Sequence, residues 1–249
     1  MIKLNRQIFA FTLLLLATNV HAQSLNDYAN QAGKAINNSS SGNSFSNLSS
    51  NDIASGLREA LQVGTKNAAG RLSAPNGFFG NSLIKILMPP EAKKVESTLR
   101  GMGLGAQVDN AILSMNRAAE DASAKAVPIF VNAITSMSIE DGLKILRGGN
   151  DAATQYLKSK ISAALTAAFR PVVSASLDKV GATKYWADIF GTYNKLPMTF
   201  KKVNPDLPAY VTERALNGLF IAIAEEESKI RSNPAARTSD MLQKVFGAH

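Results

Sequence analysis

Apolar side chains recur every three or four residues through most of the chain after residue 48, which is the period of an α-helix with one buried face. The first such stripe contains Ile53, Leu57, Leu61 and Leu72. Comparable stripes follow through Val108–Ala126, Ala153–Ala168, Trp186–Tyr193, Val211–Ile223 and Met241–Phe246. No run alternates convincingly between apolar and polar residues. The pattern therefore predicts an all-α protein, with a single domain of about eight helices over residues 49–247.

Polar residues at fixed spacing mark the starts of several helices. Ser49 with Asp52, and Ser138 with Asp141, have the spacing of a capping box, in which each side chain accepts a hydrogen bond from the other residue's backbone N–H. Side-chain caps are expected at three later helix starts, at Asn150, Asp206 and Thr238.

Two prolines fall inside helical stripes. Pro128 is expected to bend the helix that begins near Val108, before its stripe continues at Phe130. Pro171 is expected to kink a later helix. After that kink the apolar stripe is predicted to resume through Val172, Ala175 and Val180.

One apolar run has no helical period. Leu83–Met88 is closed by Pro89 and Pro90, and it fits either a short extended segment or a helical turn. Pro90 suits the first turn of the next helix, because proline lacks the N–H that this turn leaves unpaired. That helix is predicted to face inward with Val95, Leu99 and Met102.

The first 22 residues have the three parts of a secretory signal peptide. Lys3 and Arg6 are positive, and the apolar run Ile8–Ala17 is too short for a membrane-spanning helix, which needs ~20 residues. Val20 and Ala22 place small residues at the −3 and −1 positions of a cleavage site. We expect cleavage after Ala22 and a periplasmic protein of a Gram-negative cell.

After the leader, residues 23–48 are predicted to form a short helix and a flexible Ser/Asn-rich linker. We expect no transmembrane segment in the mature chain. Removing Lys3 and Arg6 lowers the formal charge from +8 to +6, so the protein is basic enough to adhere to an anionic envelope polymer or to lipid headgroups. Nucleic acid is not an expected partner in this compartment.

The absence of two residue types limits the chemistry. The chain contains no cysteine, and its two histidines are His21, in the leader, and His249, at the end. This excludes Ser-His-Asp and Cys-His catalysis, histidine-bound zinc and disulfide exchange from the mature core. Carboxylate acid/base chemistry, a Ser/Lys pair or oxygen-bound metal remains open, and we expect no cofactor.

Four segments resemble a known family. They are Ser114–Glu120, Leu177–Tyr185, Val203–Leu207 and the long block Ala224–Gly247. The segments are similar to a proteobacterial family of exported proteins that is catalogued as a domain of unknown function, DUF4197. The resemblance covers roughly residues 48–247. It implies a periplasmic α-helical domain and carries no activity, ligand or catalytic residue.

Asn116, Arg117 and Glu120 form the first candidate binding group. Arg117 and Glu120 lie three residues apart, so they are neighbours on a helix surface, and apolar flanks indicate partial burial. The arginine is expected either to bind a carboxylate or phosphate of a ligand or to form an intramolecular bridge that holds two helices together.

The second candidate group lies near the C-terminus. Glu226 is expected to continue the apolar face of its helix inward and to meet Arg117 or Arg237, while Glu227 pairs with Arg231. Arg237 and Thr238 stand where the last helix begins, and backbone N–H groups there favour an anion. We predict one partly buried charge network of Arg117, Glu120, Glu226 and Arg237.

These features support three functional hypotheses. The leading one is a non-enzymatic periplasmic domain that binds a protein partner or a small amphipathic or anionic ligand, in a groove between residues 78–88 and the helix of Trp186. The second is a hydrolase of an envelope polymer, with Glu96, Glu120 or Glu226 as the acid. The third is a structural protein that tethers itself to the envelope. The sequence predicts neither a metal site nor an oligomeric state.

Overall fold

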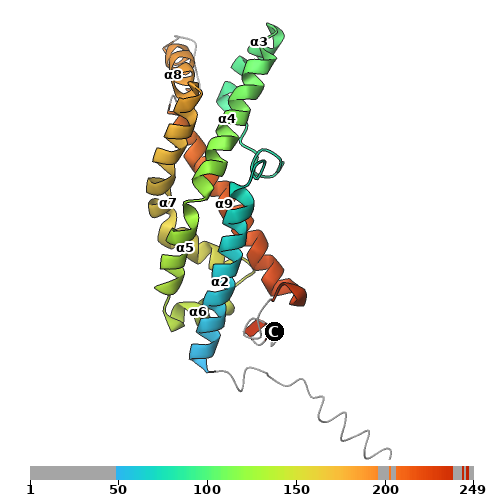
Figure 1. Ribbon diagram of the computed structural model, residues 1–249, viewed down its shortest axis with the longest axis vertical. Coiled ribbons are helices and arrows are strands. Elements are labelled where there is room, and N and C mark those ends of the chain that lie inside the picture. Colours follow the sequence, from blue (N-terminus) through green and yellow to red (C-terminus); the bar gives the residue numbers. More distant parts are fainter. Residues whose placement is uncertain (1–48, 196–201, 203–205, 238–242, 244, 247–249) are drawn as a thin grey trace, which may run out of the picture. The chain divides into compact units, whose positions relative to one another are not determined.

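Eight α-helices make up most of the computed structural model, which describes residues 49–195, 202, 206–237, 243 and 245–246 (Figure 1). They are α2 (Ser50–Ser73), α3 (Lys93–Gly101), α4 (Gly105–Ser123), α5 (Ala126–Thr135), α6 (Ile139–Leu146), α7 (Ala152–Lys179), α8 (Ala182–Tyr193) and α9 (Leu207–Ser232). Short 3₁₀ helices, η2 (Pro90–Ala92) and η3 (Pro234–Ala236), precede α3 and follow α9. These residues contain no β-strand, so the all-α prediction is confirmed. The predicted leader and linker (1–48) and Thr238 lie outside the described residues.

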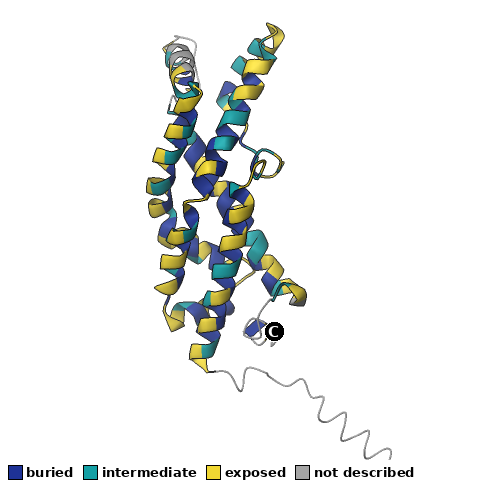
Figure 2. Ribbon diagram, in the orientation of Figure 1, coloured by how far each residue is buried: buried dark blue, intermediate teal, exposed yellow. Residues whose placement is uncertain are grey.

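Helix α9 is the centre of the packing. It lies against α7, α2 and α4, and α7 also packs against α4 and α5. In Figure 2, the residues coloured as buried lie on the inner faces of these helices. The predicted stripes are buried in α2, α4 and α9, and alanines such as Ala54, Ala118 and Ala119 are fully buried between helices. Small side chains at such contacts let the helix axes approach closely.

The capping predictions are confirmed at three of the four helix starts that the structure describes. Ser49 and Asp52 form a complete capping box, as do Ser138 and Asp141, and the carboxylate of Asp206 accepts from the Ala209 N–H. The cap predicted at Asn150 is wrong. The N-cap residue of α7 is Asp151, whose own side chain makes no capping hydrogen bond.

The two internal prolines act differently from the prediction. The helix is interrupted between Ser123 and Ala126. Pro128 therefore lies in the first turn of α5, where a missing N–H has no cost. Helix α7 runs through Pro171 without interruption. Its buried stripe therefore continues in steps of four, and the predicted stripe is wrong by one residue. The fully buried residues are Phe169, Val173 and Leu177, whereas Ala175 and Val180 are exposed.

Residues 74–89 connect α2 to η2 without helical structure beyond turns. Burial alternates along this segment: Ile84, Ile86 and Met88 are buried, whereas Leu83 and Leu87 are exposed. The extended interpretation of residues 85–88 is therefore the correct one. The inward orientation predicted for Met102 is wrong, because this residue follows the last turn of α3 and is 69% exposed.

Candidate functional site

Asn116 is fully buried on α4. Its side chain binds the backbone of residues 78–88, the extended segment. Its side-chain oxygen accepts from the Ile86 N–H at 2.8 Å, and its side-chain nitrogen donates to the Ile86 carbonyl at 2.8 Å. The same nitrogen also donates to the Ile112 carbonyl, one turn earlier in α4. All of these groups are buried, where an unpaired polar group is costly. The side chain of Asn116 therefore links the backbone of α4 to the backbone of the extended segment.

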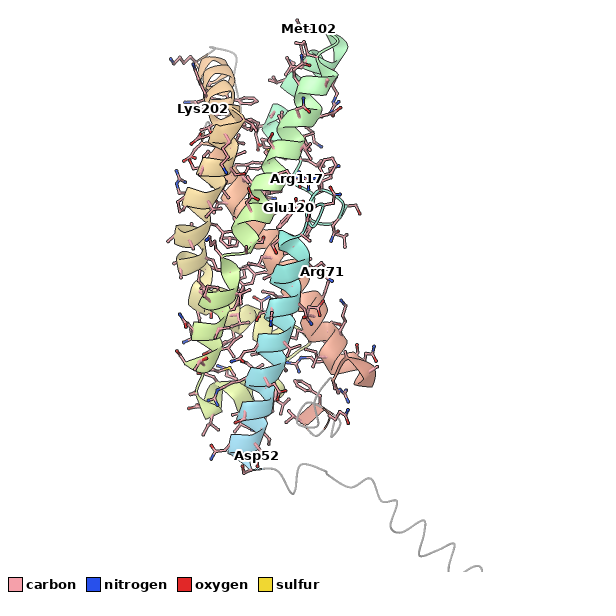
Figure 3. All side chains as sticks on the ribbon, viewed as in Figure 1. Asp52, Arg71, Met102, Arg117, Glu120 and Lys202 are labelled. Carbon is pink, nitrogen blue, oxygen red and sulfur yellow. The ribbon has the colours of Figure 1, made fainter. Side chains whose placement is uncertain are left out.

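Glu120 lies one turn further along α4 and binds the start of the same segment. One carboxylate oxygen accepts from the N–H groups of Phe78 and Phe79, at 3.1 and 3.2 Å. The other accepts from Arg117 at 2.5 Å, and Arg117 also donates to Asn76 at 2.9 Å. Figure 3 shows Arg117 and Glu120 beside this loop. Arg117 thus forms an intramolecular bridge with Glu120 within α4, and this pair joins α4 to the loop rather than to a second helix.

The extended segment is held from a third side by Tyr210 of α9. Its hydroxyl donates to the Leu87 carbonyl at 2.8 Å. Burial raises the pKa of Tyr210, so the hydroxyl keeps its proton as a donor. Residues 78–88 are therefore anchored by side chains of two helices, although the segment itself is not helical.

Glu226 and Arg237 do not join this group, so the predicted four-residue network is wrong. Glu226 pairs with Arg71 of α2 at 3.3 Å and with Lys229 at 2.8 Å. Arg237 donates to the carbonyls of Ile230 and Arg231, at the C-terminal end of α9. The last carbonyls of a helix lack intrahelical partners, and a cation is favoured there.

The inward carboxylate of α9 is Glu227, one residue after the one predicted. It accepts from the backbone N–H groups of Ala153 and Thr154, at 3.0 and 2.9 Å, and from the Thr154 hydroxyl at 2.8 Å. Arg231 pairs with it at 2.9 Å, as its spacing predicted. Glu227 thus caps the start of α7 from another helix. Steps of four from Leu219 through Ile223 lead to Glu227, which is the signal that could have identified it.

The carboxylates named for the hydrolase hypothesis all take part in ion pairs. Glu96 pairs with Arg100 at 3.0 Å on α3, Glu120 with Arg117, and Glu226 with Arg71 and Lys229. None of the three lines the pockets of about 750 and 290 Å³ among the described residues. The geometry therefore assigns them to holding helices and loops in place.

A pocket of about 750 Å³ lies between α3, α4 and α8. Figure 1 shows α3 and the start of α4 on one side of the upper end of the view and α8 on the other. Its apolar lining is Met88, Val95, Leu99, Leu104, Val108, Ala111, Leu113, Met115, Val180, Ala182, Trp186, Phe190 and Leu207. The predicted groove contains both Met88 and Trp186, but most of its wall comes from α3 and α4, which the prediction did not name.

The polar part of this lining lies on α4. Gln107, Asn110 and Ser114 line the pocket, and none of its described lining residues is charged. On the opposite wall, the rings of Trp186 and Phe190 lie 4.4 Å apart between centroids. An apolar cavity with a few uncharged polar groups is typical of sites that bind the apolar part of a ligand.

Comparison with protein families gives one match, which covers residues 47–247 and bears the description "Protein of unknown function (DUF4197)". The chain belongs to the DUF4197 family. The matched region of this DUF4197 protein contains all of the helices described above. It also contains the residues of the pocket and of the segment 78–88. Neither the curated proteins nor the solved structures that were compared include a match. No helix in the described part of the chain is long and apolar enough to cross a membrane.

Proposed function

We propose that this protein is an exported, non-enzymatic helical domain that binds the apolar part of an amphipathic ligand in the pocket between α3, α4 and α8. The single observation that carries the proposal is the apolar lining of a pocket of about 750 Å³. Natural ligand sites of ~300–1,000 Å³ are concave and mostly apolar, with few polar groups. The leader-like sequence of residues 1–22 supports export to the periplasm, where acyl-bearing molecules of the envelope are available.

An alkyl chain is the ligand group that this lining favours. Each methylene that leaves water contributes about 0.8 kcal/mol, so a chain of ten carbons contributes about 8 kcal/mol, which is of the same order as the cost of association. The side chains of Gln107, Asn110 and Ser114 offer hydrogen bonds to the polar head of a ligand beside that chain. The proposed ligand is therefore a single-chain amphiphile.

Trp186 provides a direct test, because it lines the pocket and is the only tryptophan of the chain. We would titrate the protein with stearate and with 9,10-dibromostearate and follow tryptophan emission. A bromine atom quenches an indole on contact, so the brominated chain should quench in a saturable manner while stearate does not. Equal emission with both ligands, or quenching that never saturates, would contradict the proposal.

A pocket-filling variant separates binding in the pocket from binding elsewhere. Ala111 lines the pocket and is partly buried, so Ala111→Phe should fill the space and weaken quenching at least tenfold. Ala133→Phe is the matched control, because Ala133 is also partly buried against the core but lies on α5, away from the pocket. Both variants overpack a half-buried alanine. If they bind the brominated chain equally well, the pocket is not the binding site.

Export is tested by the mass of the mature protein. If the leader is removed after Ala22, protein from the periplasmic fraction should begin at Gln23. Native mass spectrometry of the same sample should show a bound amphiphile as an added mass that disappears in Ala111→Phe. A full-length chain that starts at Met1 and stays in the cytoplasm would overturn the localisation.

A further inference from the structure

A second, smaller groove of about 290 Å³ lies between α7 and α9 and differs in character from the apolar pocket. Four residues of α7 line it in steps of four: Lys158, Ser162, Thr166 and Arg170. This spacing places them on one face of the helix, over a length of about 18 Å. A lysine and an arginine therefore stand at the two ends of a row of hydroxyl groups.

The opposite wall is formed by α9, which runs antiparallel to α7. Arg170 pairs with Asp206 near one end of the two helices, and Thr154 bonds to Glu227 near the other. This register places Thr212 of α9 opposite the middle of the row. Thr212 lines the groove, and so does Asn217.

Thr212 has an unused hydrogen-bonding group at this position. Its residue is 2% exposed, and its buried hydroxyl has no hydrogen-bond partner. A buried helical threonine normally satisfies its hydroxyl, as Thr65 does by donating to the Gln62 carbonyl at 3.2 Å. Leaving the Thr212 hydroxyl unpaired is costly, and a rotation about its Cα–Cβ bond, which turns it from the buried side into the groove, would pair it with a ligand group that accepts its proton.

The hydroxyl groups of Ser162 and Thr166 on α7 can accept hydrogen bonds from a ligand. Ser162 donates to the Lys158 carbonyl at 2.6 Å, and Thr166 donates to the Ser162 carbonyl at 2.8 Å. Their protons are therefore used, and only their oxygen lone pairs remain for a ligand. Those oxygens can accept from ligand hydroxyl groups.

The charge of the groove is positive by one. Arg170 pairs with Asp206, and Glu213, which also lines the groove, pairs with Arg214. Lys158 has no ion-pair partner among the described residues. An anionic group of a ligand would thus neutralise Lys158, while Arg170 keeps further N–H donors beyond the one that binds Asp206.

We propose that this groove is a second binding site, for a small hydroxylated anion such as a polyol phosphate or a sugar acid. The anionic group binds Lys158, the ligand's hydroxyl groups donate to Ser162 and Thr166, and the Thr212 hydroxyl donates to a ligand oxygen. The site does not depend on the apolar pocket, and either site can fail without the other.

The test is a calorimetric titration with glycerol 3-phosphate. Glycerol is the control for its hydroxyl groups, and inorganic phosphate is the control for its anionic group. We expect saturable binding of glycerol 3-phosphate, at least tenfold weaker binding of inorganic phosphate and none of glycerol. D-gluconate tests whether the site binds a hydroxylated carboxylate in place of a hydroxylated phosphate. Binding of either hydroxylated anion supports the site, and the stronger of the two identifies the anionic group.

Thr212→Val provides the decisive variant, because it keeps the side-chain shape and removes only the hydroxyl. We expect it to raise the melting temperature of the unliganded protein and to weaken binding at least tenfold, whereas Thr212→Ser restores binding. Thr65→Val, at a buried threonine whose hydroxyl is bonded, should lower the melting temperature and leave binding unchanged. The proposal is overturned if no hydroxylated anion binds saturably, if Thr212→Val binds as the native protein does, or if both valine variants lose stability alike.

Discussion

Three buried polar side chains of this protein bind backbone groups far away in the sequence. Asn116 satisfies both the N–H and the carbonyl of Ile86, Glu120 binds two N–H groups of the loop after α2, and Glu227 caps α7. Each replaces a hydrogen bond that regular secondary structure would otherwise supply. A substitution at such a position therefore leaves several backbone groups unpaired at once.

Neighbouring glutamates on α9 allow this argument to be tested. Glu227→Ala removes the partner of two backbone N–H groups, one hydroxyl and Arg231, all partly or fully buried, and should cost ~3–5 kcal/mol. Glu226→Ala removes ion pairs to the half-exposed Arg71 and Lys229 and should cost about 1 kcal/mol or less. Urea unfolding measures both, and equal losses would show that Glu227 is not a cap.

At the scale of elements, α9 is shaped by the segment that packs on it. A Cβ atom at Gly218 would lie 2.6 Å from a ring carbon of Phe78 and 3.2 Å from Ile84. Phe78 is fully buried, so its ring has no free space into which to move. The glycine in the middle of α9 therefore allows the segment of residues 78–88 to lie against the helix.

Two glycine substitutions should have opposite effects on stability. Gly218→Ala should destabilise the protein by ~1–3 kcal/mol through overpacking, although alanine is the better helix former. Gly70→Ala, in the interior of α2, should stabilise by ~0.5–1 kcal/mol, because a Cβ atom there would meet no neighbouring atom within 4 Å. Thermal unfolding of the two variants measures both changes in stability. A gain of stability at both positions would mean that Phe78 is not in close contact with Gly218.

The start of α9 should depend on pH through Asp206. Burial alone would raise the pKa of this carboxyl, but hydrogen bonds from Arg170 and the Ala209 N–H outweigh burial and lower it. A lowered folded-state pKa means that the contribution is complete above the unfolded value of ~3.9 and is lost as the pH falls through the folded value. Since both side chains are largely exposed, we expect ~0.5–1 kcal/mol.

The variant Asp206→Asn tests that dependence. It should be less stable than the native protein at pH 7, and the difference should shrink as the pH falls through the lowered folded-state pKa, because the native side chain then also loses its charge. Arg170→Gln should show the same loss at pH 7, since it removes the other partner. A difference in unfolding free energy that stays constant between pH 7 and pH 3 would rule out the Asp206 carboxylate as its source.

At the scale of the whole molecule, the folded domain should be independent of the first 48 residues. Helix α2 begins with its own capping box, and its buried stripe starts at Ile53. A protein that starts at Ser49 should therefore unfold at the same temperature as the mature chain. A protein that starts at Ile53 loses the box and should be less stable by about 1 kcal/mol. A large loss already in the protein that starts at Ser49 would show that residues 23–48 pack on the core.

The sequence by itself determined the fold class, most helix positions and both capping boxes. These features depend on residues within about four positions of each other, which is the range of a helical turn. The ion pairs Arg117–Glu120 and Glu227–Arg231 could be predicted for the same reason. The polar residues that neighbouring helices bring together could not.

Only the tertiary structure decided what those polar residues do. The cap of α7 comes from Glu227, 74 positions after Ala153, and Asn116 meets Ile86 across 30 positions. Neither pairing has a local pattern, because each depends on how two distant parts of the chain approach. The apolar pocket and the unpaired hydroxyl of Thr212 arise in the same way, since a cavity and a missing partner are properties of the packing between elements.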